Sequence, residues 1–236
     1  SLTLRPPMHI RVNHARTDRD TLIETLRKED IEAIAISDVQ YGLEIKGRAN
    51  IIATKMYKSG LFEVQDASSQ RLCESLPIET GTRVLDLCAG AGGKSLALAA
   101  RGANVAATDI RAKALAELEK RAQRAQSNIR LEQPSLAQIV LIDAPCSGSG
   151  RLRRNPALRW GLNDHTHLQV QQELLETATQ WVETGGLLVY ATCSLFGREN
   201  NHPTPDGWFT KTAHTLWPHR DQTDGFYWRE MVRDPA

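Results

Sequence analysis

The chain has 236 residues, 41% of them hydrophobic, and its 29 Lys and Arg against 28 Asp and Glu leave a formal net charge of +1. This length and composition predict one large globular domain with a smaller one, and the near-zero charge excludes a global basic field, so any nucleic-acid site must be a local patch. No apolar run of about 18 residues predicts a membrane-spanning helix, and nothing resembles a signal peptide.

Residues 1–64 predict a small α+β domain. Within it, residues 17–28 predict a helix that Thr17 caps, with Asp20 completing a weak form of the capping box. Alternating apolar residues predict strands, which are residues 8–13, 33–36 and 41–45. The arginines of this domain are candidates for phosphate contacts, or for an ordinary solvated surface: Arg5, Arg11, Arg16 and Arg19.

Residues 65–236 predict a larger domain, which a helix at 66–76 connects to the first. Residues 83–100 then predict a buried strand, a glycine turn and a helix, an arrangement that lets a ligand approach the backbone at a helix N-terminus. The spacing of Gly90 and Gly93 excludes a P-loop. The dinucleotide pattern fits only in part, because Ser95 stands where its third glycine belongs, and a glycine turn without ligand is the alternative.

The next predicted strand, 104–108, is followed by Asp109, which lies 19 residues after Gly90. An acid at this position accepts hydrogen bonds from both ribose hydroxyls of an adenosine moiety. NAD and S-adenosylmethionine both contain such a ribose. Asp109 alone therefore leaves both cofactors open.

Two further predicted strands lead into cysteine-containing turns. Strand 138–143 leads into Cys146 and strand 186–192 leads into Cys193. Because the carboxyl ends of parallel strands lie at one edge of an open sheet, we expect the polar residues after these strands to share that edge. They are Cys88, Asp109, Asp143, Cys146 and Cys193. The alternative is that the thiols are small core residues, since free cysteine is often buried.

Four arginines follow the first cysteine turn: Arg151, Arg153, Arg154 and Arg159. Guanidinium groups suit a clamp on RNA phosphates, with Pro156 and Trp160 ordering the loop. A solvated run of charge is the alternative.

The predicted strand 128–133 lies only about five residues before strand 138–143, whereas a crossover between parallel strands takes a dozen or more residues. Either 128–133 is not a parallel strand or residues are missing near 134–138, and we favour the second interpretation. The segment 201–207 is similarly abrupt. Predicted helices at 112–126 and 167–183 and an antiparallel last strand at 226–232 complete this domain.

Several segments together resemble the Sun/nucleolar-protein family of S-adenosylmethionine-dependent RNA cytosine-5 methyltransferases, closest to its bacterial 16S ribosomal RNA type. They are residues 60–70, 86–94 (DLCAGAGGK), 143–150 (DAPCSGSG), 153–160 (RRNPALRW) and 190–194 (YATCS). One departure is that Gly90-Ala91 replaces the Ala-Pro of the family's cofactor loop, which makes the loop less rigid but leaves its backbone donors.

The resemblance implies an α/β fold: a class I, Rossmann-like methyltransferase sheet with helices on both faces and a small N-terminal RNA-recognition-like subdomain. It implies that Cys193 attacks C6 of cytosine, which makes C5 nucleophilic, and that Cys146 assists release. The residues alone do not rank the two thiols, because DNA cytosine methyltransferases attack with the Pro-Cys thiol. It also implies an S-adenosylmethionine site formed by Cys88, Ala89, Gly90, Ala91, Gly92, Gly93, Lys94, Asp109 and Asp143. The family's acid at the adenine side has only Glu132 as a poor substitute.

The implied partner is RNA, with ribosomal RNA favoured over transfer RNA, and we expect a cytoplasmic monomer without membrane or metal. Four widely spaced cysteines, two of them needed as thiols, indicate a reducing compartment, and no C-x-x-C motif or histidine pair suggests zinc. The rival classes are an NAD-dependent oxidoreductase, which leaves Cys146 and Cys193 unexplained, and a noncatalytic RNA-binding factor, against which the intact cysteines argue.

Overall fold

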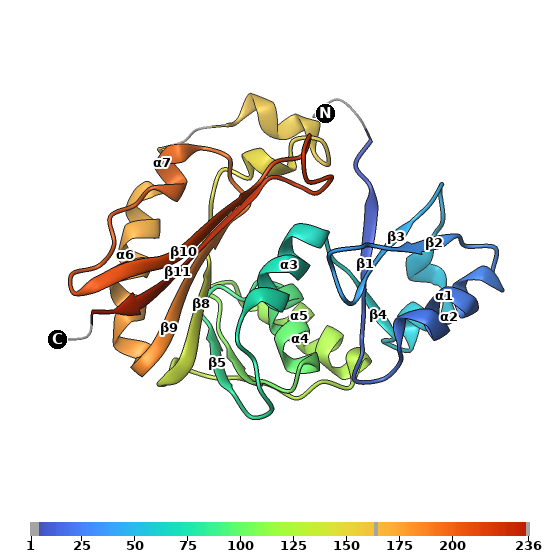
Figure 1. The fold of residues 1–236 in the computed structure, drawn as a ribbon, viewed down its shortest axis with the longest axis horizontal. Helices are drawn as coiled ribbons and strands as arrows, with labels where there is room; N and C mark the ends of the chain where they lie inside the picture. Colours follow the sequence, from blue (N-terminus) through green and yellow to red (C-terminus); the bar gives the residue numbers. More distant parts are fainter. Residues whose placement is uncertain (1–4, 163–164, 235–236) are drawn as a thin grey trace.

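Two β-sheets organise the protein in a computed structural model that describes residues 5–162 and 165–234. Figure 1 shows the small sheet beside the large one, with helix α3 between them. The small sheet is antiparallel and has the order β2-β3-β1-β4. Its strands are β1 (Met8–Val12), β2 (Ala33–Ala35), β3 (Gly42–Ile45) and β4 (Phe62–Val64).

Helix α1 (Arg19–Arg27) covers the small sheet and buries Leu22 and Leu26 in its core. The predicted cap Thr17 is wrong. Asp18 caps the helix instead, because its backbone is extended and its carboxylate accepts the backbone N–H of Thr21 at 2.8 Å. The short helix α2 (Lys55–Lys58) lies before β4. The small sheet and its helices thus form a hydrophobic core of their own.

The large sheet has the order β10-β11-β9-β8-β5-β6-β7. Strands β5 to β9 run parallel, whereas β11 is antiparallel to both β9 and β10. This confirms the predicted class I sheet and its antiparallel last strand. The strands are β5 (Arg83–Asp86), β6 (Asn104–Ala107), β7 (Ile129–Leu131), β8 (Ala137–Asp143), β9 (Val182–Thr192), β10 (Trp208–Leu216) and β11 (Phe226–Arg233).

Helices cover both faces of this sheet, with α3, α4 and α5 on one side and α6 and α7 on the other (Figure 1). The alternation of side chains along the central strands explains the two layers. Val84 of β5 packs in the cluster that contains α3 and α4, and its neighbour Leu85 packs with α6. The helices are α3 (Ala67–Ser75), α4 (Gly93–Ala100), α5 (Ala112–Ala125), α6 (Leu168–Ala178) and α7 (Gly197–Asn200).

Two elements differ from the sequence-based expectation. The helix predicted for 167–183 ends at Ala178, and a 3-10 turn (Thr179–Trp181) leads directly into β9. Strand β10 was not predicted, because its residues are mostly polar and exposed. Its pairing with β11 along nearly its whole length holds this edge strand in place.

The connection between β7 and β8 is short. Strand β7 pairs parallel with β6, so the alternative that this segment is not a parallel strand is wrong. Only residues 132–136 lead from this strand at the sheet's edge past β6 and β5 to β8. Three strand spacings amount to roughly 14 Å, which five extended residues can bridge only without a crossover helix.

The small sheet docks on α5 of the larger domain. Asn13 donates a hydrogen bond from its side chain to the carbonyl of Ala125 at 2.9 Å. Glu63, which is 2% exposed, forms ion pairs with Arg121 at 2.8 Å and Arg124 at 2.6 Å. These polar contacts fix the small sheet against the domain that contains the glycine turn.

Candidate active site

The glycine turn after β5 presents backbone to a ligand. Gly90 and Gly92 adopt left-handed conformations with φ of 55° and 80°, and α4 begins at Gly93. A Cβ on Gly92 would lie 2.5 Å from Cγ of Leu118. Glycine is therefore required at position 92 both by conformation and by the packing of α5.

Asp109 lies beside this turn, at the end of β6, as predicted. Its carboxylate accepts the backbone N–H groups of Gly90 and Arg111, each at 2.8 Å. The guanidinium of Arg111 binds both carboxylate oxygens, at 2.9 and 2.8 Å, and these hydrogen bonds lower the pKa of Asp109. Ile110, which the sequence reasoning missed, leaves its apolar side chain fully exposed between these two charged residues.

Lys94 and Asp143 form an ion pair of 2.6 Å beneath the turn. Burial lowers the pKa of Lys94, but the Asp143 carboxylate more than offsets this, so the net pKa is raised and the lysine stays charged. Below them, Asp86 is fully buried and accepts one hydrogen bond from Ser95 at 2.7 Å, while its other oxygen has no partner among the described residues. Burial raises the pKa of Asp86 to about 7.

The structure brings the two predicted thiols together at the ends of neighbouring strands. The Sγ atoms of Cys146 and Cys193 lie 3.4 Å apart. Their hydrogen bond raises the pKa of the Cys146 thiol and lowers that of the Cys193 thiol, which makes Cys193 the more readily ionised of the two. By contrast, burial raises the pKa of Cys88 to about 12. Cys88 is therefore a poor nucleophile.

The turn after Cys146 packs directly against the turn before β11. Gly225 donates its backbone N–H to the carbonyl of Gly150 at 2.9 Å. A Cβ on Gly150 would lie 2.0 Å from the carbonyl oxygen of Gly225. The backbones of these two turns therefore touch, which leaves no room for a side chain at position 150.

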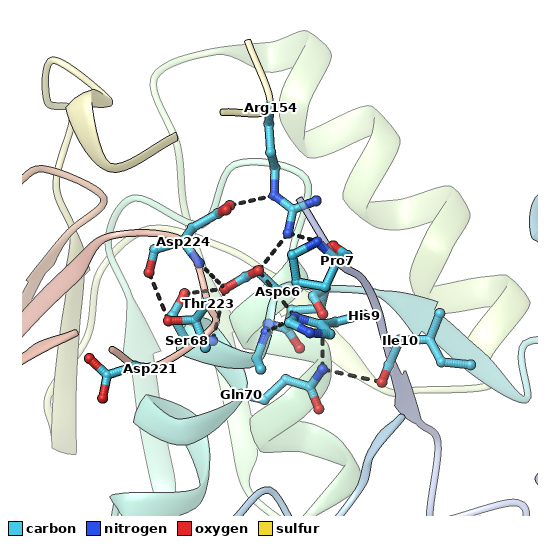
Figure 2. Close-up of polar contacts among 12 residues, drawn as sticks. Pro7, His9, Ile10, Asp66, Ser68, Gln70, Arg154, Asp221, Thr223 and Asp224 are labelled. Atoms are coloured by element: carbon cyan, nitrogen blue, oxygen red, sulfur yellow. Dashed lines mark hydrogen bonds and ion pairs between the residues drawn. The ribbon is translucent and has the colours of Figure 1, made fainter. Parts of the chain in front are cut away.

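The four arginines after Cys146 divide into two pairs. Arg153, which is 9% exposed, and Arg154 both bind the carboxylate of Asp224. Figure 2 shows Arg154 between Asp224 and Asp66, with His9 on the far side of Asp66. Arg151 and Arg159, in contrast, are exposed. Only this second pair presents guanidinium groups to solvent without breaking these ion pairs.

A cavity of about 330 Å³ opens beside Cys193. Its walls come from both sheets and from the loop after Cys146, and they include Met8, His9, Asp66, Lys94, Asp143 and Arg151. The thiol of Cys193, the ion pairs Lys94–Asp143 and Arg154–Asp66, and apolar side chains that include Val64 and Phe226 therefore line the same space.

Among residues 5–162 and 165–234, no cluster of three or more His, Cys, Asp or Glu side chains has the arrangement of a metal site. No helix in these ranges has the length and apolar character needed to cross a membrane.

The parallel sheet with its antiparallel last strand, the glycine turn after β5 and the acid after β6 define the class of S-adenosylmethionine-dependent methyltransferases. Within this class, the chain belongs to the family of 16S rRNA methyltransferases RsmB/F, whose catalytic domain matches residues 74–206. The ferredoxin-like domain of the same family matches residues 2–52.

Comparisons with individual proteins agree. Ribosomal RNA small subunit methyltransferase B of Yersinia pseudotuberculosis is 30% identical over 258 residues, which cover 97% of this chain and 60% of that protein. The same enzyme of Pectobacterium atrosepticum is 28% identical over 260 residues, covering 98% and 60%. The chain thus spans about 60% of the length of these curated relatives. Because the alignments are longer than this chain, the relatives contain internal residues without counterpart here.

Two solved structures are similar. The crystal structure of PH0851 is 28% identical with a TM-score of 0.90, covering 98% of this chain and 61% of that one. NSun6 from Pyrococcus horikoshii has a TM-score of 0.86 over the whole of this chain and 93% of its own, and at 17% identity it supports the fold alone.

Proposed function

We propose that this protein transfers a methyl group from S-adenosylmethionine to C5 of a cytosine in RNA, with ribosomal RNA as the substrate. The observation that carries the proposal is the pair of thiols, whose sulfur atoms lie 3.4 Å apart, whose pKa values are shifted in opposite directions, and of which Cys193 lines a cavity. The name of the relatives, ribosomal RNA small subunit methyltransferase B, supports the choice of RNA.

In this proposal Cys193 is the nucleophile. Its thiolate adds to C6 of cytosine, and the electrons of the C5–C6 double bond make C5 nucleophilic. After C5 has received the methyl group, it loses its proton, the double bond re-forms and the C6–S bond breaks to return the thiolate. The lowered pKa of Cys193 supports this role, because the thiolate and not the thiol attacks.

Cys146 takes the second role, in release. While Cys193 is a thiolate, the neighbouring charge 3.4 Å away opposes ionisation of Cys146. Once Cys193 is bonded to C6 as a neutral thioether, this opposition disappears. Cys146 can then lose its own proton to solvent and, as a thiolate, accept the C5 proton, so the order of the two steps follows from the coupling between the thiols.

The cofactor supplies an electrophilic methyl group. In the proposal it is held by residues 88–94, Asp109 and Asp143, and the glycine turn offers backbone N–H groups to it. Asp109 would hold the ribose hydroxyls in place of its present partner Arg111, and the exposed side chain of Ile110 would offer an apolar surface to the adenine. Lys94 and Asp143 also line the cavity beside Cys193, where they present donors and acceptors to the base.

RNA phosphates are assigned to the arginines that remain exposed. Arg151 lines the cavity. Arg159 lies over the indole ring of Trp160, with its Cζ 4.6 Å from the ring centroid, and Trp160 itself is 81% exposed. An exposed tryptophan beside a guanidinium suits an unstacked RNA base next to its phosphate. Arg153 and Arg154 contribute to RNA binding indirectly in this proposal, by fixing the loop that carries the exposed pair.

The domain boundary lies between residues 64 and 65 in this proposal, where β4 ends and the α3 cap begins. We place some of the relatives' additional residues in the connection between β7 and β8, where they would carry the acid at the adenine side. The free thiols are consistent with a reducing cytoplasm. We propose a monomer.

The deciding experiment supplies the protein with labelled S-adenosylmethionine and, in separate reactions, small-subunit ribosomal RNA and transfer RNA. The methylated position is then read by bisulfite sequencing. Label at C5 of a cytosine in ribosomal RNA supports the proposal. Label on transfer RNA alone would mean that transfer RNA, and not ribosomal RNA, is the substrate. Tight binding of NAD with no methylation would refute the proposal.

A further inference from the structure

Glu199 of α7 is completely buried, and its carboxylate lies between the two cysteine turns. One oxygen accepts the backbone N–H of Ser147 at 2.8 Å. The other accepts the Ser147 hydroxyl at 2.6 Å and the Ser194 hydroxyl. Ser147 directly follows Cys146, and Ser194 directly follows Cys193. A single carboxylate thus binds the neighbour of each thiol.

Further hydrogen bonds fix both the side chain and the main chain of Glu199. Gln171 of α6, also fully buried, donates to the Glu199 carboxylate at 3.3 Å and to the carbonyl of Pro145 at 2.8 Å. The hydroxyl of Tyr190 donates to the backbone carbonyl of Glu199 at 2.7 Å. The side chain and the main chain of Glu199 are therefore both anchored, and Pro145, which precedes Cys146, belongs to the same network.

The two serines also contact one another, with their hydroxyl oxygens 3.2 Å apart. Neither Glu199 nor the serines contact a sulfur atom in any recorded hydrogen bond among the described residues. Hydrogen bonds to an ionised carboxylate are about twice as strong as neutral ones, and a buried N–H left without its acceptor is costly. A single buried carboxylate therefore links the residues that follow the two thiols, in addition to the hydrogen bond from the Gly150 N–H to the Cys193 carbonyl at 2.9 Å.

We propose that Glu199 is a positioning residue that sets the distance between Cys146 and Cys193 through Ser147 and Ser194. The catalytic meaning of that distance rests on the proposed function. The distance itself is a property of the folded chain and can be measured without RNA or cofactor. Loss of the carboxylate removes the links through Ser147 and Ser194 and lets the sulfur atoms separate, while the hydrogen bond from the Gly150 N–H to the Cys193 carbonyl still joins the two turns.

The test uses dibromobimane, whose two arms each lose bromide to one thiolate, so that it joins only neighbouring thiols. Wild-type protein and Glu199→Gln are treated for increasing times, and the Cys146–Cys193 bridge is quantified by peptide mapping. Monoalkylation of Cys193 by iodoacetamide across pH gives the ionisation of that thiol in the same samples. The matched control is Glu173→Gln, an exposed glutamate on α6.

We expect Glu199→Gln to slow bridging at least tenfold and to raise the apparent pKa of Cys193, because its hydrogen bond from Cys146 is weakened. Glu173→Gln should match wild type. Bridging within twofold of wild type in Glu199→Gln would overturn the proposal. Should Glu199→Gln not fold, Ser147→Ala and Ser194→Ala each remove a hydroxyl contact of the same carboxylate and must show the same direction.

Methylation assays on the same proteins separate the two proposals. If wild type methylates RNA and Glu199→Gln loses mainly kcat with little change in KM, both proposals stand. If wild type methylates no cytosine but bridging still depends on Glu199, the proposed function fails and the positioning role stands. If methylation is intact in a Glu199→Gln variant that also bridges normally, the positioning role fails alone.

Discussion

Arg154 and Asp66, which are 88 residues apart in the chain, form an ion pair with an N–O distance of 2.6 Å. Asp66 also caps α3 by accepting the backbone N–H of Ser68 at 2.9 Å, and it accepts the backbone N–H of Asp224 at 3.0 Å. His9 of β1 completes this cluster at 3.2 Å (Figure 2). The pair therefore joins the small sheet, the arginine loop and the turn before β11 around one carboxylate.

Removing the charge of Arg154 should destabilise the protein without abolishing its fold. Arg154→Met leaves the carboxylates of Asp66 and Asp224 without their shared cation, and breaking a buried pair costs about 3–5 kcal/mol. Because Arg154 is 26% exposed, we expect its loss to lower the free energy of unfolding, measured in urea, by about 2–3 kcal/mol. The exposed Arg151→Met is the control. Equal midpoints for both variants would show that the pair contributes no net stability.

Asp86 should make the free energy of unfolding fall as the pH rises from about 4 to about 7. Burial raises its pKa to about 7 from an ordinary value of 3.8, so between these pH values the unfolded chain has lost a proton that the folded protein keeps. Ionisation then favours unfolding, by on the order of 4 kcal/mol above pH 7. Asp86→Asn escapes this cost and still accepts from Ser95.

The measurement is thermal or urea unfolding of wild type and Asp86→Asn at pH 4 and pH 8. We expect the advantage of Asp86→Asn to be larger at pH 8. The exposed Asp206→Asn controls for removal of a surface carboxylate. An advantage that is the same at both pH values would contradict the raised pKa.

Substitutions of Asp109 and Arg111 should have opposite effects on the affinity for the cofactor. Asp109→Ala removes the charged acceptor for the ribose and should weaken S-adenosylmethionine binding by about 2–3 kcal/mol in calorimetry. Arg111→Ala should bind at least as tightly as wild type, because in the structure the guanidinium occupies both oxygens that the ribose needs. A parallel loss in both variants would instead mean that Arg111 contacts the cofactor.

Serine variants of the two cysteines should differ in whether a covalent protein–RNA intermediate accumulates. Cys193→Ser should form no covalent RNA adduct and no product, because a serine hydroxyl is hardly ionised at neutral pH. Cys146→Ser should attack and transfer the methyl group but release slowly, so a protein–RNA band survives denaturing electrophoresis. The double variant controls for non-covalent association. An adduct in Cys193→Ser alone would reverse the assignment.

RNA affinity should depend on salt through the exposed arginines. The double variant Arg151→Ala/Arg159→Ala should lose about 0.7 in the slope of log affinity against log salt for each phosphate contact removed from single-stranded RNA. Arg83→Ala is the control, since Arg83 pairs with Glu183 at the opposite edge of the sheet. Parallel slopes in wild type and the double variant would place the phosphate contacts elsewhere.

Local patterns predicted most of the fold and part of the site. The strand, glycine turn and helix of residues 83–100 follow from neighbouring residues alone, and the parallel sheet then places Cys146 and Cys193 at one edge. What depends on distant partners was not predictable. Arg154 pairs with an acid 70 residues away in Asp224, and no local signal distinguishes that guanidinium from a solvated one. Glu199 likewise acquires its importance only where two strand ends meet.

The contact between Gly150 and Gly225 has an evolutionary consequence. A side chain at position 150 would collide with backbone rather than with a flexible neighbour, so no repacking of side chains relieves it. A change at position 150 is tolerable only with a displacement of the turn before β11. Among homologues these two positions should therefore be invariant together, and a sequence that changes one should also differ in the length or course of the other turn.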